Sequence, residues 1–291
     1  MEDKESITIR KAVINQAINY IFEHIDEDIT VEDVAKYCSY SKYHLTRMFK
    51  EDTDEAIYQF IKRVRLERSA WRLKVEKERS IMEIGETYGY SSSNFATAFK
   101  KHLDISPADY RRSSEQMVED SSFSHGMTLD DLDDAGSKIT VEYLAPFTVL
   151  YERKKGNYHN LSDEWCDFIE KYRYLATKDT LYIECTIDDP SITDEDGCMY
   201  ELCQTIIPDH PVLKDHPEIL LHDFEGGKYA VYHFKGVPQL LFMVYQEIFC
   251  RWLSKTGNEL DERPIIDIYR KIEEDGYMEI DICFPLKTKL S

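Results

Sequence analysis

The chain has 291 residues, and its 56 Asp and Glu outnumber 36 Lys and Arg, which gives a net charge of −20 near pH 7. This length predicts about two domains, and without a long apolar run or a signal peptide we expect no membrane contact. Seven scattered cysteines show no CxxC pair and no Cys/His zinc spacing, so we expect reduced thiols in a cytoplasmic protein without metal or cofactor.

The first part of the chain predicts a series of short helices. Ile14–Ile25 is expected to lead, followed by Thr30–Cys38, which begins at a threonine cap. After a turn, Ser41–Lys50 predicts another helix, with Leu45 and Phe49 four residues apart on one face. Two short helices joined by a tight turn are typical of a helix-turn-helix unit.

The same pattern returns 50 residues later, since Phe49 and Phe99 each open a Phe-Lys pair. Ile81–Tyr88 predicts the first helix of the second unit, and Phe95 and Phe99 mark the buried face of its second helix. Glu55–Lys74 has an apolar stripe and is expected to form a long joining helix. Two such units can enter two successive major grooves on one face of DNA, roughly 34 Å apart.

Four short motifs identify this region. They are Ser41-x-x-x-Leu45-x-Arg47-x-Phe49-Lys50, Gly89-Tyr90-Ser91, Phe95-x-x-x-Phe99-Lys100 and Ser106-Pro107-x-x-Tyr110-Arg111. Together they resemble the AraC family of transcription regulators over about residues 10–112. The family usually has Gly after each recognition helix, where this chain has Asp54 and Asp104. Aspartate tolerates the left-handed conformation better than most residues, so the turn is expected to survive at a cost.

The resemblance implies an all-α double helix-turn-helix domain, residues 1–112, that binds double-stranded promoter or operator DNA. Arg47 is expected to be the best base reader. The other candidate contacts are Lys42, Tyr43, Thr46 and Lys50 on the first recognition helix, and Ser93, Asn94, Thr97, Lys100 and Lys101 on the second. Thr97 stands where the family often has Arg, which predicts weaker base reading there, and the three lysines at 50, 100 and 101 suit phosphates. RNA polymerase is left open as a further partner.

Charge divides unevenly along the chain. Residues 1–112 hold 19 basic and 20 acidic side chains, whereas residues 113–291 hold 17 and 36. The excess acid therefore lies outside the expected DNA-binding domain and favours cationic partners. Residues 113–137 are rich in Ser and Asp with little apolar periodicity, which predicts a linker.

From residue 138 the pattern becomes α+β and repeats itself. The expected strands and helices are Ile139–Arg153 broken at Pro146, Leu161–Tyr174, Leu181–Ile187, Tyr200–Ile207, Ile219–Phe234 around Gly226-Gly227, Leu240–Leu253, Ile265–Arg270 and Met278–Phe284. Trp165 lies nine residues after Gly156 and Tyr245 nine after Gly236, while Ile169 and Phe249 each lie thirteen after. The sequence therefore predicts a multidomain α and α+β protein whose second domain is a duplicated β-α-β-β unit with a cleft between its halves.

Several motifs of this half resemble a GyrI-like effector-binding domain. They include Gly156-x-Tyr158, Asp188-Asp189-Pro190, Gly226-Gly227-x-Tyr229-Ala230-Val231 and Pro264-x-x-Asp267-x-Tyr269. The resemblance covers residues 138–291 and implies a cleft for small amphipathic, often cationic molecules, as in multidrug binding. The candidate ligand contacts are Tyr151, Trp165, Tyr245, Asp267 and Tyr269. Asp267 stands where the family commonly has Glu, which keeps the charge and shortens the reach.

Two other interpretations stay open. Some GyrI-like domains hydrolyse small reactive compounds with a pocket carboxylate, and the acidic second domain could dock a protein partner. The sequence contains no HExxH and no G-x-S-x-G, and the nine histidines show no paired spacing. We therefore expect no catalytic residues and a regulator rather than an enzyme.

Overall fold

The computed structural model describes residues 4–114, 135–156, 161–189, 191–193, 197–216, 218–237, 240–241, 244–273 and 277–288. Contacts divide the chain into two compact units, one comprising residues 1–73 and 79–110 and the other residues 74–78 and 111–291. Most of the predicted linker lies outside the described residues. At its two ends, residues 113–114 and 135–137 are helical rather than extended.

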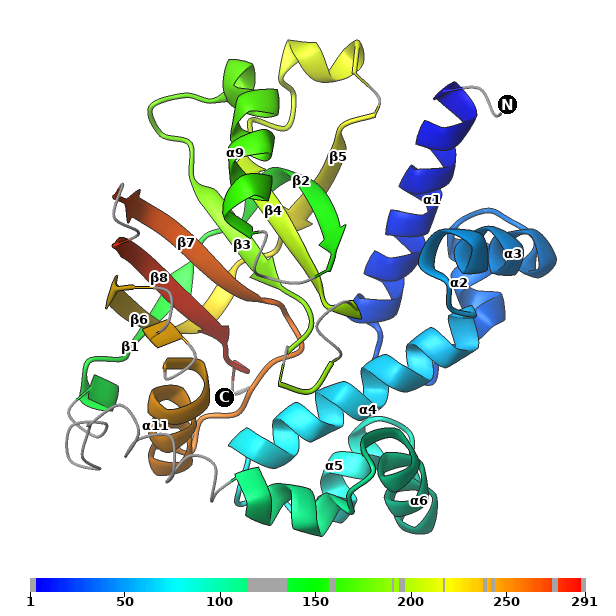
Figure 1. The fold of residues 1–291 in the computed structure, drawn as a ribbon, viewed down its shortest axis with the longest axis vertical. Helices are drawn as coiled ribbons and strands as arrows, with labels where there is room; N and C mark the ends of the chain where they lie inside the picture. The colour runs from blue at the N-terminus through cyan, green and yellow to red at the C-terminus, as the bar shows by residue number, and fades with distance from the viewer. Residues whose placement is uncertain are drawn as a thin grey trace. The chain divides into compact units, whose positions relative to one another are not determined.

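The first unit is entirely helical (Figure 1). Its helices are α1 (Lys4–Glu23), α2 (Val31–Tyr37), α3 (Lys42–Thr53), α4 (Ile57–Val75), α5 (Ile81–Thr87) and α6 (Ser92–Leu103), followed by helical residues 107–114. The pairs α2–α3 and α5–α6 are the two predicted helix-turn-helix units, and α4 joins them. The predicted leading helix is present but begins about ten residues earlier than its apolar spacing indicated.

Matching caps explain why both units start where they do. Thr30 accepts a hydrogen bond from the backbone N–H of Asp33, whose carboxylate in turn accepts one from the N–H of Thr30. Ser80 and Glu83 form the same reciprocal box at the start of α5. Each box satisfies two backbone groups that the first helical turn leaves unpaired. The N-cap residue of α6 is Ser91, although its side chain makes no capping hydrogen bond.

Both recognition helices end in a left-handed aspartate, as expected. Asp54 has φ 62° and ψ 8°, and Asp104 has φ 57° and ψ 10°. The side chains that face inward are fully buried. Leu45 and Phe49 on α3 correspond to Phe95 and Phe99 on α6. The 50-residue repeat thus corresponds to a structural repeat of caps, core positions and helix ends.

The second unit is built on one antiparallel sheet of eight strands. Its strands are β1 (Thr140–Leu144), β2 (Phe147–Lys155), β3 (Tyr182–Thr186), β4 (Met199–Thr205), β5 (Leu220–Phe224), β6 (Gly227–Gly236), β7 (Ile265–Ile272) and β8 (Met278–Pro285). Their order across the sheet is β1-β6-β8-β7-β3-β4-β2-β5. The helical elements are α9 (Leu161–Tyr172), the 3₁₀ turns Arg173–Leu175 and Pro211–Lys214, the π-helical turn Val244–Ile248 and α11 (Phe249–Thr256).

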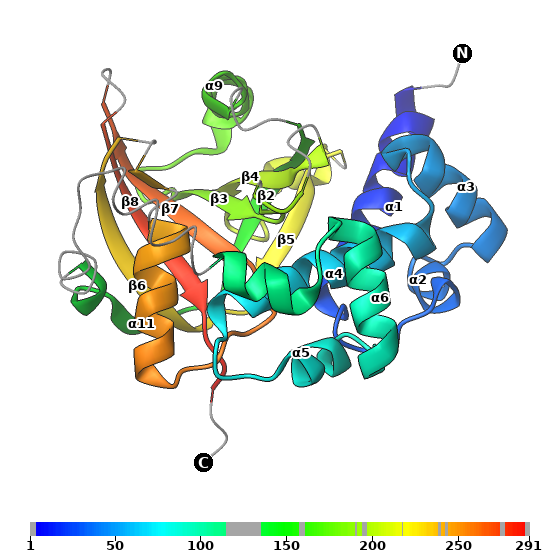
Figure 2. The ribbon, with the colours of Figure 1, turned by 60° about the horizontal axis from the view of Figure 1, so that its bottom comes forward.

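This order confirms the predicted duplication. Exchanging β1–β4 for β5–β8 reproduces the same pairing pattern, with β3 and β7 meeting at the centre. The first strand of each half pairs with the other half, since β1 lies beside β6 (Figure 1) and β5 lies beside β2 (Figure 2). The two halves are therefore joined at three ladders and form one continuous sheet.

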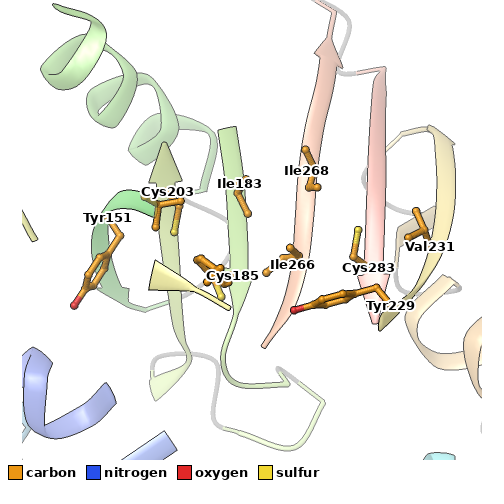
Figure 3. Packing of buried hydrophobic residues seen from close by; sticks show 11 residues of the cluster. Tyr151, Ile183, Cys185, Cys203, Tyr229, Val231, Ile266, Ile268 and Cys283 are labelled. Atoms are coloured by element: carbon orange, nitrogen blue, oxygen red, sulfur yellow. The ribbon is translucent and has the colours of Figure 1, made fainter. Parts of the chain in front are cut away.

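The two faces of the sheet carry different cores. On one face, α9 contributes Trp165 and Phe168 to a cluster with Leu150 of β2, and α11 stacks Phe249 on Phe284 of β8 with ring centroids 3.5 Å apart. The other face carries a cluster of aliphatic residues, cysteines and aromatic residues from the seven strands β2 to β8 (Figure 3). Both helices thus cover the same face, which becomes the site described below.

A π-helical turn corrects one detail of the predicted duplication. The sequence alignment matched Ile169 with Phe249, but Ile169 is 36% exposed whereas Phe249 is fully buried. Phe168 of α9 is the buried counterpart. The predicted helix Leu240–Leu253 contains the π-helical turn Val244–Ile248, and such a turn adds one residue to the helical repeat. The alignment therefore slips by one position after Tyr245.

The left-handed helix ends generate a stability prediction. Asp54→Gly should raise the free energy of unfolding of the first unit by about 0.5–1 kcal/mol, because glycine adopts positive φ without the steric cost that aspartate bears. The gain also includes removal of a negative charge near the C-terminal end of the helix dipole. Thermal unfolding followed by circular dichroism measures it. Asp54→Ala is the matched control, because alanine retains the steric cost; an equal gain in both variants would contradict the conformational explanation.

Candidate functional site

The exposed face of α3 carries most of the predicted base readers. Tyr43 is 80% exposed, and the side chain of Arg47 is 61% exposed. Lys42 forms an ion pair with Glu32, and Arg47 lies 3.7 Å from Glu51 one turn further along the helix. Lys50 is also exposed, while Thr46 is half-buried and its hydroxyl has no hydrogen-bond partner. α3 therefore presents cationic and aromatic groups together on one surface.

The corresponding face of α6 is more polar and less charged. Ser93, Asn94 and Thr97 are exposed, but the hydroxyl of Thr97 donates a hydrogen bond of 3.0 Å to the carbonyl of Ser93. Lys100 and Lys101 line a surface hollow of about 470 Å³, together with Ala96, Thr97 and Ser106. The two lysines thus lie at one hollow, whereas the Thr97 hydroxyl is hydrogen-bonded to the backbone of α6.

At the centre of the second unit, two acidic side chains oppose each other. Antiparallel pairing of β3 with β7 places Glu184 directly across from Asp267, on the face that α9 and α11 cover. Adjacent partners on one face of a sheet have Cβ atoms about 5 Å apart. Glu184 is 4% exposed and Asp267 is 3% exposed. Two carboxyl groups therefore share a desolvated position at the seam between the halves.

Tyrosines supply the hydrogen bonds to this acid pair. The hydroxyl of Tyr269 donates to Oε2 of Glu184 at 2.8 Å, and that of Tyr245 donates to Oδ2 of Asp267 at 2.6 Å. Trp165 occupies the place in α9 that Tyr245 has in the second half, and its ring centroid lies 5.3 Å from that of Tyr269. Each carboxyl is thus held by an aromatic side chain that reaches it from a different element.

Burial sets the protonation of the acid pair. Desolvation raises the pKa of Glu184 to about 7, although the hydrogen bond from Tyr269 and the nearby indole N–H of Trp165 oppose the shift. Desolvation also raises the pKa of Asp267 well above its ordinary value, the charge of Glu184 adds to the rise, and the Tyr245 hydrogen bond opposes it. Two like charges at this separation in a dry environment cannot both be ionised without a cation nearby.

Several buried polar atoms near the acid pair lack partners. They are Oδ1 of Asp267, the indole Nε1 of Trp165 and both amide atoms of Gln204. Gln204 lies on the same face, since it pairs with Tyr182 while Glu184 pairs with Leu202. Buried polar groups in folded proteins are nearly always hydrogen-bonded, so orphaned atoms at one place indicate a site that another molecule completes.

One predicted ligand contact lies elsewhere. Tyr151 belongs to the cluster on the opposite face, with Ile183 and Cys203, as Figure 3 shows. Side chains alternate along a strand, so Tyr151 faces away from Leu150, which packs beneath α9. The structure therefore brings Trp165, Tyr245, Asp267 and Tyr269 together and excludes Tyr151 from that group.

Glu184 is the site residue that sequence reasoning missed. The signal was present, since Glu184 is a lone acid inside the apolar stretch LYIECTI. Asp267 was recognised by the same feature, an acid among Ile265, Ile266 and Ile268. The duplication was aligned on glycines and helices, and that spacing does not match Glu184 with Asp267, because the connections between helix and strand differ in length.

The described part of the chain offers neither a metal site nor a membrane-spanning helix. No group of three or more His, Cys, Asp or Glu side chains there is arranged to hold a metal ion. Among the same residues, no helix combines the length and apolar character needed to cross a bilayer. All seven cysteines are free thiols, and only Cys166 is exposed.

Relatives of the chain match the first unit. The transcriptional regulator Rob of Salmonella typhimurium is 39% identical over 104 residues, which are 35% of this chain and 36% of Rob. The regulatory protein SoxS of the same organism is 37% identical over 100 residues, which are 34% of this chain and 92% of SoxS. The match therefore spans about a third of the length of Rob and nearly all of SoxS.

One solved structure of low identity covers about half of the chain. The EcmrR C-terminal domain is 12% identical and aligns with a TM-score of 0.43, covering 52% of this chain and 97% of that domain. Family comparisons match a helix-turn-helix domain to residues 34–113 and a GyrI-like small molecule binding domain to residues 137–287. Since the latter match covers just over half of the chain, the protein belongs to the GyrI-like family, with an AraC-type helix-turn-helix domain preceding its GyrI-like domain in the order seen in Rob.

Proposed function

We propose that the protein is a cytoplasmic transcription regulator that binds double-stranded DNA through residues 1–112 and a small cationic effector through residues 138–291. The observation that carries the first part is the exposed face of α3, where Tyr43 and Arg47 project from a helix whose opposite side is buried. A recognition helix needs this combination of a rigid inner face and an outer face of base-reading side chains.

The two recognition helices are proposed to contribute unequally. On α3, Arg47 can donate two hydrogen bonds to a guanine edge once it leaves Glu51. On α6, the Thr97 hydroxyl is engaged by its own helix, while Lys100 and Lys101 suit phosphate oxygens. We infer that α3 provides most of the sequence preference and that α6 mainly positions the protein on DNA.

Arg47→Ala should cost on the order of 1–3 kcal/mol of binding to a selected site and relax its sequence preference. Titration of parent and variant against the selected site and a scrambled site measures both effects. Glu51→Gln is the matched control, because it releases Arg47 from its ion pair and leaves the reader intact. It should tighten binding to both DNAs. An equal loss on both sites in Arg47→Ala would assign Arg47 to a phosphate contact.

The second part of the proposal rests on the acid pair and its aromatic surroundings. A buried carboxylate without a cation is costly, whereas a delocalised organic cation can neutralise it and contact the aromatic rings. Trp165, Tyr245 and Tyr269 surround the carboxyls with such rings, and Oδ1 of Asp267 has no partner. We infer that the effector is an amphipathic cation whose charge lies next to Asp267.

Asp267→Asn should weaken binding of a cation about tenfold or more, because a desolvated ion pair exceeds the roughly 1.4 kcal/mol that a tenfold change requires. Phenyltrimethylammonium and tert-butylbenzene form a test pair of the same shape and different charge. Calorimetry should show a loss for the cation and little change for the neutral molecule. Asp167→Asn, an exposed position on α9, removes the same charge at the surface and should change neither.

A loss of both ligands in Asp267→Asn would indicate a structural role for the carboxyl. The acid pair also makes hydrolysis a second candidate activity, since a protonated carboxyl beside an ionised one is typical of general acid–base catalysis. Consumption of the ligand by the parent and not by the variant would favour that activity. RNA polymerase remains a proposed partner of the DNA-bound regulator.

A further inference from the structure

The site at the β3–β7 seam contains two carboxyl groups, although a single carboxylate would neutralise a monovalent cation. Glu184 and Asp267 are equivalent residues of the two halves and lie opposite each other at the pseudo-twofold axis. Neither carboxyl forms an ion pair with a Lys, Arg or His of the described residues; each has a tyrosine hydroxyl as its hydrogen-bond donor. The second carboxyl therefore needs a role of its own.

Among the described residues, the titratable side chains whose pKa the charge of the pair helps to raise all stay neutral near pH 7. These groups are Tyr200, Cys203, Tyr245, Tyr269 and Cys283, and burial raises the pKa of each one above its ordinary value. They come from β4, β7, β8 and the π-helical turn, so they include the elements packed around the seam. Among these buried groups of the described residues, Glu184 and Asp267 are therefore the ones that can gain or lose a proton near pH 7.

Resting on the proposed cationic effector, we infer that the Glu184–Asp267 pair holds a proton in the ligand-free protein and that the cation binds in exchange for it. The exchange conserves charge: one carboxyl O–H bond breaks, the proton leaves to solvent, and the positive charge of the ligand replaces it. Asp267 is the carboxylate that meets the cation, because its buried Oδ1 has no hydrogen-bond partner. Glu184 is a positioning residue. Its carboxyl group lies close to that of Asp267 and thereby keeps the proton on the pair.

The exchange makes effector binding depend on pH. Desolvation raises the pKa of Glu184 to about 7 and that of Asp267 well above its ordinary value, so a neutral or mildly acidic solution leaves the pair protonated. Below this range each cation must displace a proton, and the affinity should increase up to tenfold per pH unit. At higher pH the pair has already lost that proton, so the affinity should level off.

Calorimetry with phenyltrimethylammonium at about pH 6, in phosphate and in imidazole buffer, measures the released proton directly. The binding enthalpy measured in phosphate should differ from that measured in imidazole. The difference should equal the difference between the ionisation enthalpies of the two buffers, times the number of protons released per ligand, which should be close to one. Binding should also tighten several-fold or more between about pH 6 and about pH 8. Enthalpies that agree in both buffers, with an affinity that does not change with pH, would overturn the inference.

Glu184→Gln separates proton storage from direct ligation. The amide retains an oxygen for the Tyr269 hydroxyl and removes the charge that adds to the desolvation raising the pKa of Asp267. The variant should therefore bind the cation at least as tightly as the parent near pH 6, release less than half as much proton, and show a flattened pH dependence. Asp267→Asn should instead bind more weakly at both values. If Glu184→Gln weakens binding equally at both pH values, Glu184 contacts the cation and the inference fails.

Stability without ligand provides a control on folding. A carboxyl whose pKa is raised in the folded state stabilises the protein most below its ordinary pKa, and that stabilisation is lost as the pH rises through the folded value. The thermal midpoint of the parent should therefore fall from about pH 5 to about pH 8, and the fall should be smaller in Glu184→Gln. A parent that binds no cation at either pH overturns the proposed effector, whereas binding without proton release overturns only the exchange.

Discussion

The ladder between β3 and β7 is the constraint on which the second unit depends. It is the only pairing within the described strands that joins equivalent elements of the two halves, and it fixes the register of everything beside it. Because side chains alternate along a strand, that register also decides which residues lie beneath α9 and α11. A shift of one residue would turn Glu184 and Asp267 toward the opposite core and replace them with Ile183 or Ile268.

Burying two acids at this ladder costs desolvation free energy. The pairing and packing of the rest of the sheet offset that cost. The outer strands β1 and β5 each cross to the other half, so the seam is held at three places. On the opposite face, tightly buried side chains from seven strands pack into one cluster (Figure 3). Such packing can offset the desolvation of a polar pair, and sites that bind ligands often retain groups that lower stability.

The fold of both units could be predicted from the sequence because each unit contains an internal sequence repeat. Repeated caps at Thr30 and Ser80 define the helical repeat, and the same spacing predicts the left-handed residues that end its recognition helices. Local rules suffice there, since capping and helical periodicity act within a few residues. The strand pattern likewise predicts the broken strand at Pro146 and the turn at Gly226.

The site was harder to predict, since it depends on register between distant strands. Tyr151 was a candidate ligand contact and lies on the face opposite the acid pair. An apolar run such as Val149-Leu150-Tyr151 gives no alternation to reveal which side chains face the helices. Glu184 was missed because only pairing with β7 brings it to Asp267. The π-helical turn shifts the alignment by one residue, a change that periodicity does not detect. Sequence therefore identified the chemistry of one carboxyl, and tertiary structure supplied the second.

In the first unit, the electrostatic question is how a nearly neutral domain binds DNA. Residues 1–112 are nearly neutral, which is unusual for a domain that binds a polyanion. On α3, the cations are paired with acids in exposed positions, Lys42 with Glu32 and Arg47 with Glu51. Exposed ion pairs contribute only about 0–1 kcal/mol, so a DNA phosphate or guanine edge can replace the acid at little cost. Near-neutrality at α3 thus limits long-range attraction to any DNA, while the short-range contacts that distinguish one sequence from another remain available.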